Sequence, residues 1–162
     1  MIRLVDSNVL HVANDSAAET YGPACVLACT RLLLDIQRRG VLALDDRYEI
    51  LREYLNQADE RGQPGVGDAF LKWAKSNEYV LEKCARVLIT PHPERGWKEY
   101  PETASLADFD PSDRKFVAVS LSHPDRPRIH NATDSDWHEH AGALAEHGVR
   151  VVQECPALSA TS

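Results

Sequence analysis

Short apolar runs alternate along the chain with longer stretches in which apolar residues recur at helical spacing. The runs have the length and composition of buried strands and lie at residues 2–5, 41–44, 87–90, 128–133 and 149–153. The helical stretches lie at residues 23–39, 45–58, 68–77, 79–86, 110–120 and 137–147. This alternation predicts an α/β fold, with a mainly parallel sheet of about four or five strands between helices.

The length and composition indicate one domain with a substantial core. The chain has 162 residues, of which 43% are hydrophobic. We expect a single domain over residues 1–155, followed by a tail at 156–162. The chain shows neither an apolar run of membrane length nor a signal peptide, so we expect no membrane association and a cytoplasmic location.

The four cysteines lack the spacing of a zinc site, because they form no CxxC pair and have no histidine at ligand spacing. Cys25 and Cys29 stand four residues apart on an apolar helix. We expect all four, Cys25, Cys29, Cys84 and Cys155, to be buried reduced thiols, in keeping with a reducing compartment.

Acidic residues follow two of the predicted strands. Asp6 ends the first strand, while Asp134 and Asp136 come directly after the run at 128–133. Ligands of open α/β sheets bind beyond the carboxyl ends of the strands, where these acids should meet. A turn or helix-capping role is an equally good interpretation of Asp6 taken alone.

Two further acids lie on helices beside this edge. At about 100° per residue, Asp113 falls on the inward face with Phe116, although an acid in a first helical turn can also serve the helix dipole. Glu53 stands at the border of the apolar arc of its helix and can reach a cleft, whereas Glu49 points to solvent. Geometry therefore favours Glu53 over Glu49.

The segment at residues 90–103 is predicted to be a loop, since it holds three prolines and a glycine. Its Arg95, Lys98, Trp97 and Tyr100 would suit contact with a phosphate backbone and a splayed base. Aromatic residues that fix the loop to the body of the protein are an equally good interpretation.

Clustered carboxylates repel one another unless cations lie between them. We expect Arg114 and Lys115 to point away from the acids, so that no internal salt-bridge network balances them. Hard divalent ions such as Mg²⁺ prefer carboxylate oxygens and can support hydrolysis of phosphodiesters. The net charge of −7 argues against a nonspecific nucleic-acid binder, but acids gathered in one metal pocket would weaken that argument.

Four motifs in this order resemble the PIN domain family of nucleases: VDSN at residues 5–8, EILREYL at 49–55, DPSDRKFVAVS at 110–120 and NATDSDW at 131–137. The resemblance covers nearly the whole chain. It implies a three-layer α/β/α sandwich and an endoribonuclease that depends on Mg²⁺ or Mn²⁺. By position it implies the site acids Asp6, Glu53, Asp113, Asp134 and Asp136, of which Asp6, Asp113 and Asp134 hold the metal.

The same resemblance implies that Ser7, Asn8 and Thr133 orient the carboxylates. It also implies partners: an RNA substrate, an antitoxin or DNA-binding protein of the toxin and antitoxin type, or a second copy of the chain. Two other classes stay open. One is a noncatalytic module that binds RNA or a partner, and the other is a structure-specific DNA nuclease or a metal-dependent phosphatase with the same acids.

Overall fold

A five-stranded parallel sheet forms the centre of the protein. The computed structural model describes residues 1–156, and nearly all of the predicted tail at 156–162 lies outside this range. The strands stand in the order β3-β2-β1-β6-β7, and every neighbouring pair is parallel. Their bounds are β1 Ile2–Val5, β2 Val41–Asp45, β3 Cys84–Val87, β6 Arg128–Asn131 and β7 Val151–Gln153.

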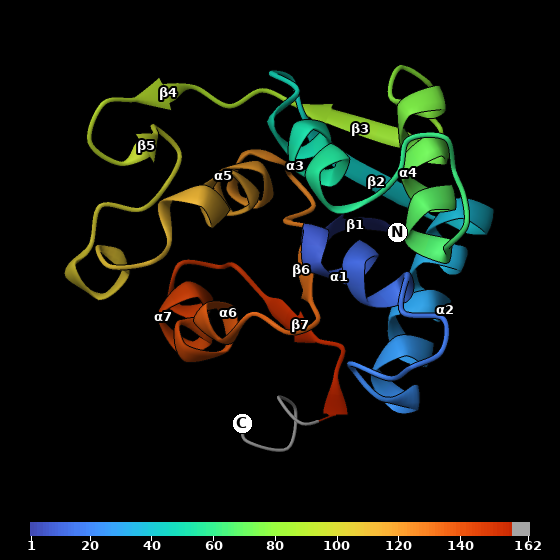
Figure 1. The fold of residues 1–162 in the computed structure, drawn as a ribbon. Helices are drawn as coiled ribbons and strands as arrows, with labels where there is room; N and C mark the ends of the chain where they lie inside the picture. Colours follow the sequence, from blue (N-terminus) through green and yellow to red (C-terminus); the bar gives the residue numbers. More distant parts are fainter. Residues whose placement is uncertain (157–162) are drawn as a thin grey trace.

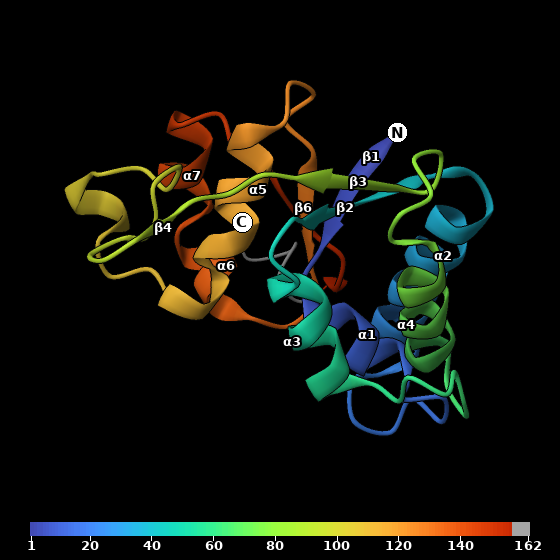
Figure 2. The ribbon, with the colours of Figure 1, turned by 90° about the horizontal axis from the view of Figure 1, so that it is seen from above.

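Helices cover both faces of the sheet, so the predicted three-layer α/β/α fold is confirmed. Figures 1 and 2 show one group on one side: α1 Ser7–Ala13, α2 Pro23–Arg39, α3 Glu49–Gln57 and α4 Val66–Asn77. The other side carries α5 Arg114–Ser122, α6 Ser135–Glu139 and α7 Ala141–Glu146, with the 3-10 turns η1 Ala104–Leu106 and η2 Pro111–Asp113. None of the helices in the described range is long and apolar enough to cross a membrane.

The order of the strands reverses beside the central strand. From β1 the chain moves outward to β2 and β3, and it later returns to pair β6 with the other side of β1. Because the strands are parallel, the carboxyl ends of β1 and β6 lie side by side at this reversal, where α/β proteins bind ligands. Val5 of β1 pairs with His130 of β6, so Asp6 and Asn131 come next at the same edge.

Several predicted elements differ from those of the structure. The helix expected over 110–120 begins as the 3-10 turn η2, and the helix expected over 137–147 is divided into α6 and α7. The helix expected over 79–86 is absent: a turn is followed by β3, which is the edge strand and begins three residues before the predicted run at 87–90. The helix expected from residue 45 begins at Glu49, because the Asp45 carboxylate accepts hydrogen bonds from the backbone N–H groups of Arg47, Glu49 and Ile50 and caps it.

The predicted loop over 90–103 contains a short antiparallel hairpin, β4 Pro91–His92 with β5 Gly96–Trp97. Tyr100 is buried and donates its hydroxyl to the carbonyl of Leu106, and Arg95 donates to the carbonyls of Lys98 and Tyr100. Tyr100 therefore fixes the segment to the body of the protein.

The expectation of four reduced thiols is wrong for two of them. Cys25 of α2 and Cys155, which follows β7, form a disulfide, while Cys29 and Cys84 are free and buried. The partners are separated by 130 positions, so no spacing motif marked them as a pair. The disulfide removes the cysteine-based argument for a reducing compartment.

Candidate metal centre

Three acids from three separate elements meet at the carboxyl edge of the sheet. Asp6 follows β1, Asp113 is the last residue of η2 and directly precedes α5, and Asp134 follows β6. One carboxylate oxygen of each lies within 4.8 Å of those of the other two. These are the three residues expected to hold a metal.

Asp6 is held rigidly. It is 3% exposed, and its Oδ1 caps α1 by accepting from the backbone N–H of Asn8 (3.0 Å) and contacts the Ser7 hydroxyl (3.4 Å). Its Oδ2 accepts from the indole Nε1 of Trp137 at 2.7 Å. Burial raises the pKa of Asp6 to about 6, with smaller contributions from the charges of Glu53 and Asp134. The Asp6 carboxylate therefore caps α1 and also belongs to the group of three acids, so both interpretations of this residue hold.

Asp113 is the most perturbed acid of the cluster. It is 6% exposed, as its predicted inward position requires, and its Oδ2 has no hydrogen-bond partner among the described residues. Burial, followed by the charge of Asp6 and contact with Asp134, holds the pKa of Asp113 well above its ordinary range. Such a group needs either a proton or a cation.

A buried amide positions Asp134. Asn131 is fully buried; it donates to the backbone carbonyl of Asp134 (2.9 Å) and accepts from its backbone N–H (3.2 Å). Asn8 joins this arrangement by donating to Asn131 (2.8 Å) and accepting from the N–H of Ala132 (2.9 Å). The Asp134 carboxylate then caps α6 through the N–H of Asp136 (2.9 Å). Asn8 thus connects the carboxyl end of β1 to the carboxyl end of β6.

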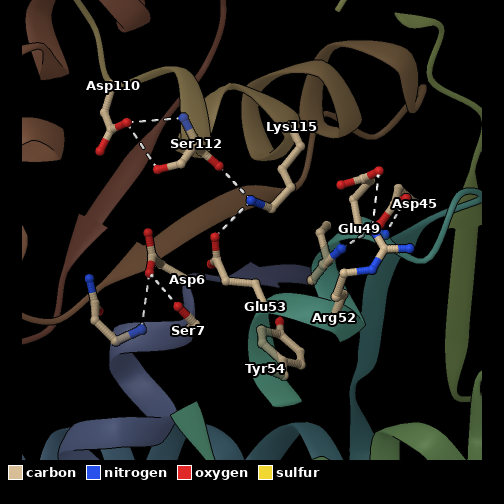
Figure 3. Close-up of polar contacts among 12 residues, drawn as sticks. Asp6, Ser7, Asp45, Glu49, Arg52, Glu53, Tyr54, Asp110, Ser112 and Lys115 are labelled. Carbon is tan, nitrogen blue, oxygen red and sulfur yellow. Dashed lines mark hydrogen bonds and ion pairs between the residues drawn. The ribbon is translucent and has the colours of Figure 1, made fainter. Parts of the chain in front are cut away.

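Glu53 points from α3 toward the side of Asp6, whereas Glu49 pairs with Arg52 (3.3 Å) away from it (Figure 3). Glu53 does not belong to the group of acids whose oxygens lie within 4.8 Å of one another. The charge of Glu53 contributes to the raised pKa values of Asp6 and Asp113. Its Oε2 is buried without a hydrogen-bond partner among the described residues. The predicted preference for Glu53 over Glu49 agrees with this arrangement.

The expectation that Lys115 points away from the acids is wrong. Lys115 is 8% exposed, and its Nζ lies 2.7 Å from Oε1 of Glu53 and donates to the carbonyl of Ser112 (Figure 3). Arg114 is also buried, but it donates to the backbone carbonyls of Arg95, Ala107 and Phe109. One cation of this pair thus forms an ion pair with a predicted site acid, Glu53.

Two of the expected residues stand apart from the three acids. Asp136 accepts from the backbone N–H of Asp110 (2.9 Å) and pairs with His140 (3.2 Å), and it falls in a second group with Glu139 and His140. Thr133 is exposed, and its hydroxyl bonds to none of the described carboxylates. Of the small polar residues, Ser7 and Asn8 contact the site.

Sequence reasoning missed the roles of three residues: Trp137, Asn131 and Lys115. Trp137 and Asn131 stand at the two ends of the segment NATDSDW. A buried indole and a buried amide each need a partner, which is the signal that could have assigned them to the neighbouring acids.

The donor set suits a hard divalent ion. It offers carboxylate oxygens and no sulfur, and buried oxygens of Asp113 and Glu53 lack a donor among the described residues. The residues present therefore fit Mg²⁺ or Mn²⁺. No family model matches the sequence, and comparisons with curated proteins and with solved structures found no match.

Proposed function

We propose that the protein is an endoribonuclease that depends on Mg²⁺ or Mn²⁺, with Asp6, Asp113 and Asp134 as the metal ligands. The observation that supports it most is the convergence of these three carboxylates, one with a buried oxygen that has no hydrogen-bond partner in the described structure. A bound divalent ion would activate water and stabilise the charge that develops on a phosphodiester.

The protein residues have separate roles in this proposal. Trp137 and the N–H of Asn8 hold Asp6, and Asn131 holds the backbone of Asp134. These contacts fix two ligands before the ion binds, which lowers the cost of assembling the site. RNA is favoured as substrate by the resemblance of the four motifs to the PIN family.

The test is cleavage of a mixed RNA pool by the purified protein, with Mg²⁺ or Mn²⁺ and with a chelator. Asp134→Asn should abolish cleavage while the fold persists, because an asparagine oxygen can still cap α6. Asp125→Asn is the matched control, because Asp125 is exposed and precedes β6, whereas Asp134 follows the carboxyl end of that strand. Full activity of Asp134→Asn would refute the proposal.

The same preparation separates the alternatives. Single-stranded DNA, duplex DNA with a flap and a small phosphomonoester are offered beside the RNA. Preferential cleavage of the DNA would favour a DNA nuclease, and turnover of the monoester alone would favour a phosphatase. Saturable Mn²⁺ binding without cleavage of any substrate would favour a binding module.

A further inference from the structure

Lys115 places a positive charge against Glu53, the glutamate whose own charge acts on Asp6 and Asp113. It extends from the first turn of α5 toward Glu53 of α3, and its ammonium is held between the Glu53 carboxylate and the carbonyl of Ser112 (Figure 3). Its side chain is 10% exposed, and the ammonium lies 5.3 Å from the centre of the Phe116 ring. The contacts with Glu53, Ser112 and Phe116 therefore define the position of the ammonium.

The ammonium takes one of the two carboxylate oxygens of Glu53, Oε1, while Oε2 is buried with no hydrogen-bond partner among the described residues. Oε1 of Glu53 lies 2.7 Å from Nζ of Lys115, and a divalent ion bound to the same oxygen would be brought against the ammonium. The positive charges of the ion and the ammonium would repel strongly if both contacted this one oxygen in a partly buried site. Lysine and a metal ion are therefore alternatives at Oε1, and the charge of the ammonium also opposes binding of a second ion at Oε2.

We propose that Lys115 takes the place of a second divalent cation, so that the centre binds a single ion at Asp6, Asp113 and Asp134. This inference rests on the proposed function, since it assumes that those acids bind a metal. Glu53 then acts as the positioning residue for Lys115. The lysine supplies the positive charge that a second ion gives in two-metal phosphodiesterases.

The test is the number of Mn²⁺ ions bound per chain, measured by electron paramagnetic resonance of the unbound ion. The wild-type protein should bind one Mn²⁺ per chain, and Lys115→Met, which keeps the apolar stem, should bind two because Glu53 is released. The control is Lys75→Met, which removes the lysine of the Lys75–Glu60 ion pair (2.5 Å) on α4. It should bind one.

Glu53→Gln gives a second measurement that does not depend on the folding of Lys115→Met. It should still bind one Mn²⁺, because the retained ligands are the three aspartates. Two ions in the wild-type protein, a fall from two to one in Glu53→Gln, or an unchanged single ion in folded Lys115→Met would overturn the inference. Absence of Mn²⁺ binding in the wild type would instead refute the metal centre itself.

Discussion

Asp113 combines burial with proximity to two other acids, and this makes the metal-free protein sensitive to pH. The folded-state pKa of Asp6 rises from 3.8 to about 6, and that of Asp113 rises further. The folded protein therefore keeps protons that the unfolded chain has released. This contribution to stability is present below about pH 4 and is lost as pH rises through the folded-state pKa values.

We therefore expect the melting temperature of the metal-free protein to fall between about pH 5 and about pH 9. The shift of Asp6 alone corresponds to about 3 kcal/mol. Asp113→Asn should flatten the profile, whereas Asp125→Asn at an exposed position should leave it unchanged. Thermal unfolding in a chelator tests this, and equal slopes in the wild type and Asp113→Asn would contradict it.

Added Mg²⁺ or Mn²⁺ should reverse the trend. The ions bind the ionised carboxylates and compete with the protons, so stabilisation by metal should increase with pH. The same melting experiment, repeated with and without the ion, measures this difference. A metal-induced rise in melting temperature that is larger at low pH than at high pH would exclude the three acids as the ligands.

The site residues differ in how far the sequence predicts them. Asp6, Asp113 and Asp134 were predicted because acids stand at strand ends and on an inward helical face. Lys115 was misplaced because η2 precedes α5, and a 3-10 turn has three residues per turn. The angle projected from Asp113 to Lys115 at α-helical spacing therefore fails, although Phe116 is buried as predicted. All residues from 114 to 120 are also buried, so the start of α5 has no solvent-facing side.

At the scale of elements, Asp45 connects the sheet to the helix that carries Glu53. Its carboxylate follows Leu44 of β2, is 4% exposed and accepts three backbone N–H bonds at the start of α3. The sequence predicted the strand and the helix, but the periodic pattern does not separate a capping turn from the first helical turn. Element boundaries depend on such side-chain to backbone bonds.

Asp45→Ala should destabilise the protein by about 1 to 3 kcal/mol, because two backbone donors at the start of α3 and one in the preceding turn lose their acceptor. Asp45→Asn is the matched control, since it keeps one acceptor oxygen and should lose less. Urea unfolding of both variants measures the difference. Equal stability of Asp45→Ala and the wild-type protein would show that the cap does not hold α3.

At the scale of the whole molecule, the Cys25–Cys155 disulfide joins α2 to the segment after the last strand. A crosslink across so long a loop restricts the unfolded chain strongly and should contribute about 2 to 5 kcal/mol. Pattern analysis predicted the layers and the parallel sheet because both follow from local periodicity. It could not predict this pairing, which depends on the folded arrangement of distant segments.

Cys155→Ser should therefore lower the free energy of unfolding by that amount, and a reducing agent should destabilise the wild type but not the variant. Cys84→Ser is the control, because Cys84 is a free buried thiol. The free energy of unfolding that this substitution removes should be the same with and without the reducing agent. Urea unfolding with and without reductant provides the measurement. Identical stability of reduced and oxidised wild-type protein would contradict this role.

The central claim is that Asp6, Asp113 and Asp134 together hold a divalent ion. Its most direct test is the anomalous-difference density of a crystal soaked with Mn²⁺, because this locates the ion independently of any substrate. The account predicts a peak within coordination distance of those three carboxylates. A peak confined to Asp136, Glu139 and His140, the other acidic group on this side of the sheet, or none at the three aspartates would contradict it.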